Sequence, residues 1–74
     1  MRRLRSEKAT QLAMQNKWQE AADLNRQILE TFPEDVDTLN RLGKALLELG
    51  QYADARDQYQ KASKLDPIDA LRYE

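Results

Sequence analysis

The chain has 74 residues, enough for one small domain and too few for two independent cores. It contains no cysteine, which excludes disulfides and thiolate metal sites, and no histidine, which removes the usual metal ligand and the usual general base at neutral pH. With 12 basic and 13 acidic residues the net charge is −1, and this balance predicts no general affinity for nucleic acid.

No run in the sequence approaches the ~20 apolar residues of a membrane span. The basic start, Met1 to Arg5, would need an apolar stretch of about 7–15 residues to form a secretory signal. Ser6-Glu7-Lys8 follows instead. We therefore expect a cytoplasmic protein with no membrane partner.

The chain is predicted to be all-α. In chain order, helices are expected over residues 2–15, 18–31, 36–49 and 52–65, with a further helix starting near Ala70. The stretches between the two glycines and the two prolines are rich in Ala, Leu, Gln, Glu, Lys and Arg, which are strong helix formers. No segment alternates with the period of two that indicates a strand. The short connections make neighbouring helices antiparallel.

Glycine, proline and aspartate mark the predicted ends of the helices. Leucines spaced three and four apart place one apolar stripe on the third helix: Leu39, Leu42, Leu46 and Leu49. Gly50 follows as a residue that tolerates a left-handed C-cap. Pro33 and Pro67 stop the second helix of each pair, and Asp35 and Asp69 are expected to be N-caps that accept bonds from free helix amides. Spacing of i,i+4 also predicts two ion pairs, Asp37–Arg41 and Asp57–Lys61.

A set of residues recurs with a period of 34, the separation of Pro33 and Pro67. The other pairs in the same register are Leu12 and Leu46, Asn16 and Gly50, Trp18 and Tyr52, Ala21 and Ala55, Asp23 and Asp57, and Asp35 and Asp69. A fixed period of this length indicates a helical repeat array, in which one helix pair cannot bury its apolar face alone. We therefore look for function on a surface built by stacking.

The second unit reads Leu39-x2-Leu42-Gly43-x2-Leu46, then Gly50, Tyr52, Ala55-x3-Tyr59-x2-Ala62 and Pro67. It resembles the tetratricopeptide repeat, whose pattern is W-x2-L-G-x2-Y, then A-x3-F, then P. The small residues Gly43 and Ala55 let the two helices of a pair approach closely, and Tyr59 is large enough to fill the space beside them. The resemblance implies one domain over residues 1–74, a short right-handed α-solenoid. Repeat one would cover about 2–35, repeat two about 36–69, and a partial third or capping helix 70–74.

The first unit matches the pattern more loosely. It keeps Ala9, Leu12, Asn16, Trp18, Ala21, Ile28 and Pro33. Asn25 replaces the large aromatic residue, and the first helix carries a polar stripe of Arg5, Lys8 and Gln11 where the second unit is apolar. Terminal repeats need a polar outer face because no neighbour covers them. We interpret the first unit as the start of an array. Trp18, Tyr52 and Tyr59 are expected to pack within the array rather than to anchor a partner.

The resemblance implies a concave groove lined by the first helix of each pair, where extended peptides or partner helices bind. Its residues would be Arg3, Ser6, Thr10, Ala13, Asp37, Asn40, Lys44 and Leu47. The alternative is that these side chains form an ordinary hydrated helix face. Family members that bind chaperone tails use Lys, Asn and Arg as a carboxylate clamp. Here Ser6 and Thr10 stand where the first clamp Lys and Asn would be, and Lys44 stands where the second Asn would be. Binding of chaperone tails is therefore not expected.

The C-terminal part of the chain suggests a second surface. Two repeats fall below the usual minimum of three. An apolar face of Leu46, Leu49, Tyr59, Leu71 and Tyr73 is expected to mediate self-association as a homodimer. The alternative is that the chain is a piece of a longer array.

We expect no enzymatic activity, no cofactor and no metal, since the acidic residues sit at helix ends or on polar faces and no phosphate-binding glycine loop is present. The favoured function is a protein–protein interaction module, or scaffold, that binds a peptide or partner protein. The alternatives are a structural homo-oligomerisation unit and an accessory domain of a larger protein.

Overall fold

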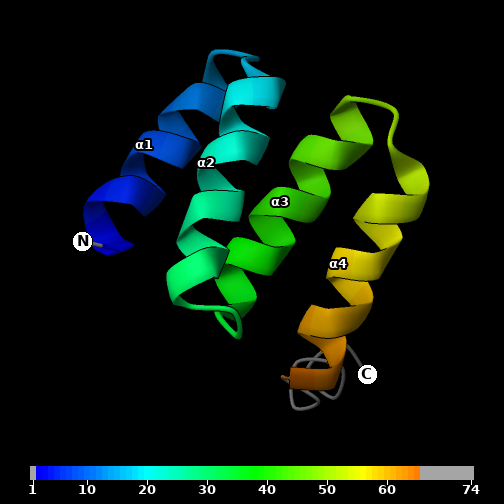
Figure 1. Ribbon diagram of the computed structural model, residues 1–74. Helices are drawn as coiled ribbons and strands as arrows, with labels where there is room; N and C mark the ends of the chain where they lie inside the picture. The colour runs from blue at the N-terminus through cyan, green and yellow to red at the C-terminus, as the bar shows by residue number, and fades with distance from the viewer. Residues whose placement is uncertain (1, 66–74) are drawn as a thin grey trace, which may run out of the picture.

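The computed structural model describes residues 2–65 and shows four α-helices (Figure 1). They are α1 Arg2–Met14, α2 Trp18–Thr31, α3 Val36–Glu48 and α4 Tyr52–Leu65, with no strand in the part described. The predicted all-α class is confirmed, and the predicted helix ends are correct to within one residue. The predicted helix near Ala70, with Pro67 and the Asp69 cap, lies outside the described residues.

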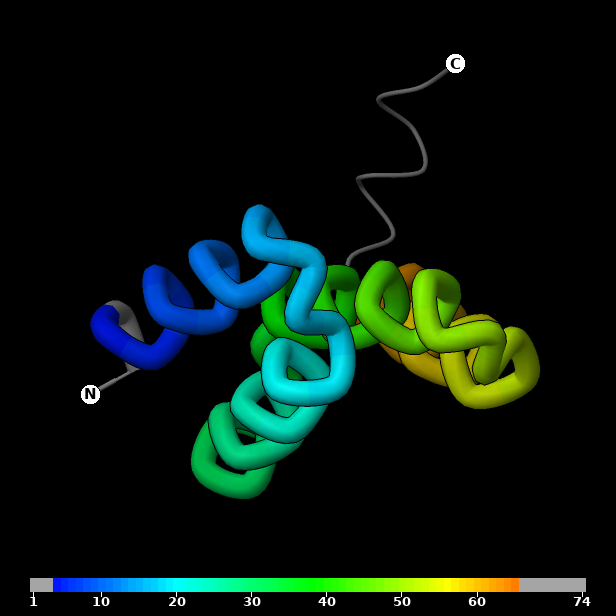
Figure 2. Tube along the Cα trace, turned by 90° about the horizontal axis from the view of Figure 1, so that it is seen from above, coloured from blue at the N-terminus to red at the C-terminus, as the bar shows by residue number. Residues whose placement is uncertain are grey.

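The helices pack in chain order, each antiparallel to the next (Figure 1). α1 also contacts α3, and the view from above places these two helices on the same side of α2 (Figure 2). The first helices of the two pairs therefore share one face of the molecule. The second helix of the first pair lies behind them.

The turns that end α1 and α3 have the same hydrogen-bond pattern, shifted by 34 residues. After α1, the Lys17 amide donates to the Leu12 carbonyl at 2.8 Å, and after α3 the Gln51 amide donates to the Leu46 carbonyl at 2.9 Å. The residue before each donor has a positive φ, 61° at Asn16 and 80° at Gly50. This is the six-residue hydrogen bond of a Schellman C-cap, and it confirms the left-handed cap predicted at Gly50.

Small and branched aliphatic side chains fill the core. The buried apolar residues are Ala9, Leu12, Ala21, Ala22, Ile28, Leu39, Leu42, Ala45, Leu46, Ala55 and Ala62. The predicted approach at Gly43 is confirmed, because a Cβ atom placed there would lie 2.8 Å from Cζ of Tyr59. The absence of a side chain at Gly43 thus lets the ring of Tyr59 lie directly against α3.

Three local predictions were wrong. Asp35 occupies the N-cap position of α3, but its side chain caps no amide and instead accepts a hydrogen bond from the Thr38 hydroxyl. The Asp37–Arg41 pair does not form, since Arg41 donates instead to the neutral acceptors Asn25 on α2, Ser6 on α1 and Thr38 on α3. The predicted Asp57–Lys61 pair does not form either. An i,i+4 ion pair that does form is Lys44–Glu48, at 3.0 Å.

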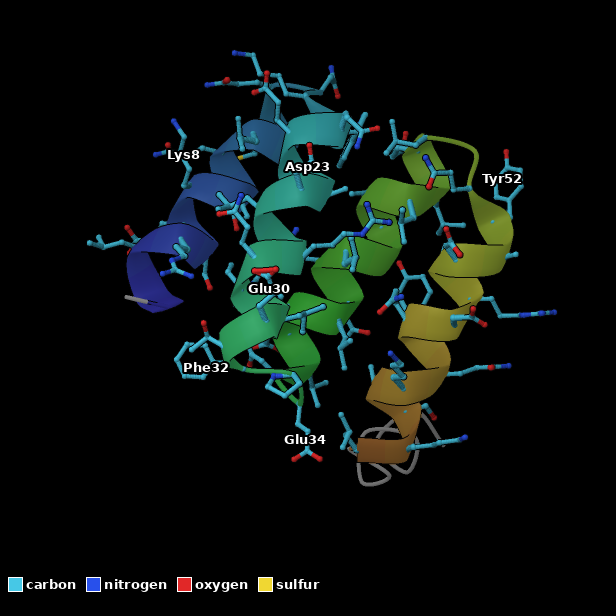
Figure 3. All side chains as sticks on the ribbon, viewed as in Figure 1. Lys8, Asp23, Glu30, Phe32, Glu34 and Tyr52 are labelled. Carbon is cyan, nitrogen blue, oxygen red and sulfur yellow. The ribbon has the colours of Figure 1, made fainter. Side chains whose placement is uncertain are left out.

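Tyr52 was expected to pack within the array and is 68% exposed, extending from the start of α4 (Figure 3). Its counterpart Trp18 is partly buried and packs against the core cluster, to which α3 contributes Leu42, Ala45 and Leu46. The positions equivalent to α3 for Tyr52 begin at residue 70, outside the described residues.

Candidate functional site

A cleft of about 190 Å³ opens where α1, α2 and α3 meet. Its walls are Ala9, Thr10, Ala13, Trp18, Ala21, Asn25, Arg41 and Lys44, and we call it the central cleft. α1 and α2 supply an apolar wall of three alanines and one indole ring. α3 supplies two cations, Arg41 and Lys44. The helix pairing explains this composition, because α1 and α3 share a face and α2 closes the space between them.

Arg41 ties the three helices together. Its Nε donates to Asn25 Oδ1 on α2 at 3.3 Å, and its Nη2 donates to Ser6 Oγ on α1 at 3.0 Å and to Thr38 Oγ1 on α3 at 2.8 Å. Asn25 and Thr38 are almost completely buried, at 2% and 0% exposure. Buried polar groups need such partners, so these bonds fix the orientation of the guanidinium group at the edge of the central cleft.

Two hydrogen-bond donors of this network, one on Arg41 and one on Asn25, have no acceptor within the described residues. Arg41 donates from Nε and Nη2, and its Nη1 group has no partner among residues 2–65. The side-chain amide nitrogen of Asn25 also has none there. In this part of the chain no unpaired polar side-chain atom is shut off from solvent, so solvent reaches both groups, and both belong to residues that line the central cleft.

Lys44 adds a third donor at this edge. Its ammonium group pairs with Glu48 at 3.0 Å, and both side chains are substantially exposed, at 58% and 40%. An exposed pair of this kind contributes little stability. Lys44 is therefore able to exchange Glu48 for another acceptor. None of the eight lining residues carries a carboxylate.

The predicted groove residues fall into three groups. Thr10, Ala13 and Lys44 line the central cleft, and Ser6 is joined to it through Arg41. Asp37, Asn40 and Leu47 lie exposed on α3 and do not line the cleft. The side chain of Arg3 is outside the described part of the chain. Thr10 bonds back to the Ser6 carbonyl at 3.0 Å, so its hydroxyl proton is already used.

The predicted self-association face is only partly exposed. Leu46 is fully buried at 0% exposure, so its placement on an open face was wrong, because it packs inside the core cluster with Leu12 and Ala55. Leu49 is partly buried, and Tyr59 is 36% exposed. Leu71 and Tyr73 lie outside the described residues.

Sequence reasoning missed the two central residues of the site, Asn25 and Arg41. Asn25 was noted as a departure from the aromatic pattern, and that departure was the available signal. Arg41 was assigned to a local pair, since its true partners Asn25 and Ser6 are 16 and 35 residues away. On the predicted polar outer side of α1, Lys8 and Gln11 are exposed and Arg5 is half-buried. Lys8 is labelled in Figure 3.

Within the described residues, no helix is long and apolar enough to cross a bilayer, and no three His, Cys, Asp or Glu side chains gather as metal ligands would.

Comparison with known proteins identifies the second helix pair. Residues 36–69 match the family model described as tetratricopeptide repeat. A segment of 46 residues is 43% identical to Protein CTR9 homolog of Arabidopsis thaliana. The segment covers 62% of this chain and 4% of that protein, so the chain spans a small part of this relative. No solved structure matches the chain.

Proposed function

Because this chain contains a tetratricopeptide repeat, at residues 36–69, we propose that it acts without catalysis as a protein–protein interaction module. Tetratricopeptide repeats in general mediate contacts between proteins. In this proposal the face shared by α1 and α3 binds a peptide or a partner protein, and the molecule works in the cytoplasm. No reaction is assigned to it.

The observation that carries the proposal is the central cleft. Three residues predicted for the groove, Thr10, Ala13 and Lys44, come from different helix pairs and line one concavity. Binding sites in proteins are typically concave, largely apolar and supplied with a few convergent polar groups. The cleft has this composition, and the open donors of Asn25 and Arg41 give it a chemical preference for acceptors.

A random-peptide display library selected on the 74-residue chain tests the proposal. Selected peptides are resynthesised and their affinities measured by calorimetry. We expect Lys44→Ala and Asn40→Ala to weaken binding, because both residues lie on the α3 side of the shared face. Exposed residues remote from that face provide the controls: Lys8→Ala matches the lost charge on the outer side of α1, and Gln60→Ala is an exposed change on α4.

Unchanged affinity in the α3 variants, with loss in Lys8→Ala or Gln60→Ala, would place binding on another surface and contradict the proposal. Failure to select any peptide that binds the folded chain would contradict it as well.

Self-association is a second candidate. Leu49, Tyr59 and Leu65 leave apolar surface on the outer side of the second pair, with Tyr59 36% and Leu65 40% exposed. The small share of the Arabidopsis relative that is matched favours a third candidate, an accessory domain within a larger protein.

A further inference from the structure

Asn25 and Tyr59 hold equivalent positions, 34 residues apart, and only the second pair carries a ring there. Tyr59 lies so close to Gly43 that no Cβ atom fits between them without a shift. In the first pair the residue equivalent to Gly43 is Ala9, and the short Asn25 replaces the ring. Ala9 and Asn25 both line the central cleft. The cleft therefore opens where the first pair lacks the aromatic side chain that the second pair supplies for itself.

The volume of the cleft suits one side chain and not a helix. At about 190 Å³ it has room for roughly six water molecules at about 30 Å³ each. Its apolar wall includes the partly buried Trp18, and an aromatic ring packs favourably against another ring at offset or edge-to-face geometry. An aromatic side chain from outside would thus find both space and a matching wall.

The opposite edge of the cleft selects for negative charge. Arg41 Nη1 and the Asn25 amide nitrogen are open donors, Lys44 is a third, and no lining residue is acidic. Asn25 is only 2% exposed, but its unpaired amide nitrogen is not shut off from solvent, so an acceptor on a ligand can approach it. A carboxylate satisfies such donors with short, charge-assisted hydrogen bonds.

We propose that the central cleft binds an aromatic side chain of a partner peptide, with an acidic residue beside it in the peptide sequence. The ring lies against Ala9, Ala13 and Trp18, in the place that a tyrosine would fill. The carboxylate accepts hydrogen bonds from Arg41 Nη1 and Lys44 Nζ. This inference rests on the proposed function and specifies the partner's chemistry.

Capped dipeptides test each half of the inference on the ¹⁵N-labelled chain. Ac-Phe-Glu-NH₂ and Ac-Glu-Phe-NH₂ cover the two sequence orders. Ac-Phe-Gln-NH₂ removes the charge and Ac-Ala-Glu-NH₂ removes the ring. We expect saturable shifts of the Trp18 indole and of the Ala13 and Lys44 amides with an aromatic–acidic dipeptide, and affinity about tenfold lower for each truncated probe. Equal affinity for all probes, or no saturable shift at these residues, would overturn the inference.

The most direct variant gives the first helix pair the glycine and tyrosine that the second pair has at Gly43 and Tyr59. Ala9→Gly with Asn25→Tyr gives the first pair its own ring over a glycine and closes the cleft from inside. If this variant does not fold, Ala13→Leu narrows the mouth of the cleft from α1 without touching the Arg41 network. Loss of dipeptide binding in a folded variant is expected. Retained affinity in whichever variant folds would contradict the inference.

The outcomes separate this inference from the proposed function. Display-selected peptides that respond to Lys44→Ala and Asn40→Ala but not to closure of the cleft would leave the proposed function standing and refute the aromatic–acidic preference. Selected peptides that bind away from α1 and α3 would refute both.

Discussion

The ring of Tyr59 lies against the backbone of Gly43, so that a Cβ atom built there would meet Cζ at 2.8 Å and Cε2 at 2.9 Å. This contact joins α3 to α4 and sets how closely the helices of the second pair approach. It gives a direct way to test the packing.

Gly43→Ala measures this contact. Alanine normally stabilises a helix interior by about 1 kcal/mol relative to glycine. Here the new methyl group must displace the Tyr59 ring, and overpacking costs about 1–3 kcal/mol. We expect a net loss of stability on urea unfolding. In a Tyr59→Ala background the same change should instead stabilise the chain by about 0.5–1 kcal/mol. The same sign in both backgrounds would show that the ring does not contact Gly43.

The left-handed turn after α3 provides a second prediction. Gly50 has a φ of 80°, and an L-residue in this region costs about 1–2 kcal/mol. Gly50→Ala should lower the free energy of unfolding by that amount. The control is Gln51→Ala at the next, exposed position, which should stay within about 0.5 kcal/mol of the wild type. Equal effects of the two changes in thermal melts would argue against the cap.

Arg41→Ala tests the network between helices. The change removes the partner of the buried Asn25 carbonyl oxygen and leaves it without a donor from the protein. An unsatisfied buried polar group costs about 1–3 kcal/mol. The matched control is Arg56→Ala, an exposed arginine on α4, for which a change below about 0.5 kcal/mol is expected. A small effect at Arg41, equal to that at Arg56, would refute the role of the network.

The sequence predicted the features that depend on residues close together in the chain or in the 34-residue register, and it missed contacts between residues far apart in the chain. The helices, the Gly50 cap and the Gly43–Tyr59 approach follow from local periodicity and from the 34-residue register, and they were predicted correctly. The bonds of Arg41 to Asn25 and Ser6 link residues 16 and 35 positions apart on three helices. No local spacing rule contains them, and the i,i+4 rule pointed to Asp37 instead.

The error at Leu46 has a related cause. The leucine stripe correctly gave the apolar side of α3, but periodicity does not say which neighbour covers each position. α1, α2 and α4 together enclose Leu46, and its exposure is 0%. The outer apolar surface of the second pair is consequently smaller than the sequence suggested.

Self-association remains a prediction. We expect the isolated chain to form a homodimer through its second helix pair and residues 70–74, which lie outside the described part. Sedimentation equilibrium over a concentration series should show mass increasing toward twice that of the monomer. Leu71→Lys with Tyr73→Lys should shift the equilibrium to monomer, while Lys8→Ala should not. A folded monomer at high micromolar concentration would rule the dimer out.

The central claim is that the face shared by α1 and α3 binds partner peptides at the central cleft. Chemical-shift mapping of a display-selected peptide on the ¹⁵N-labelled chain tests it most directly. The account predicts the largest shifts at Thr10, Ala13, Lys44 and the Trp18 indole, with little change on α4. Shifts concentrated on the exposed side of α4, around Gln60 and Lys64, with the cleft resonances unmoved, would contradict it.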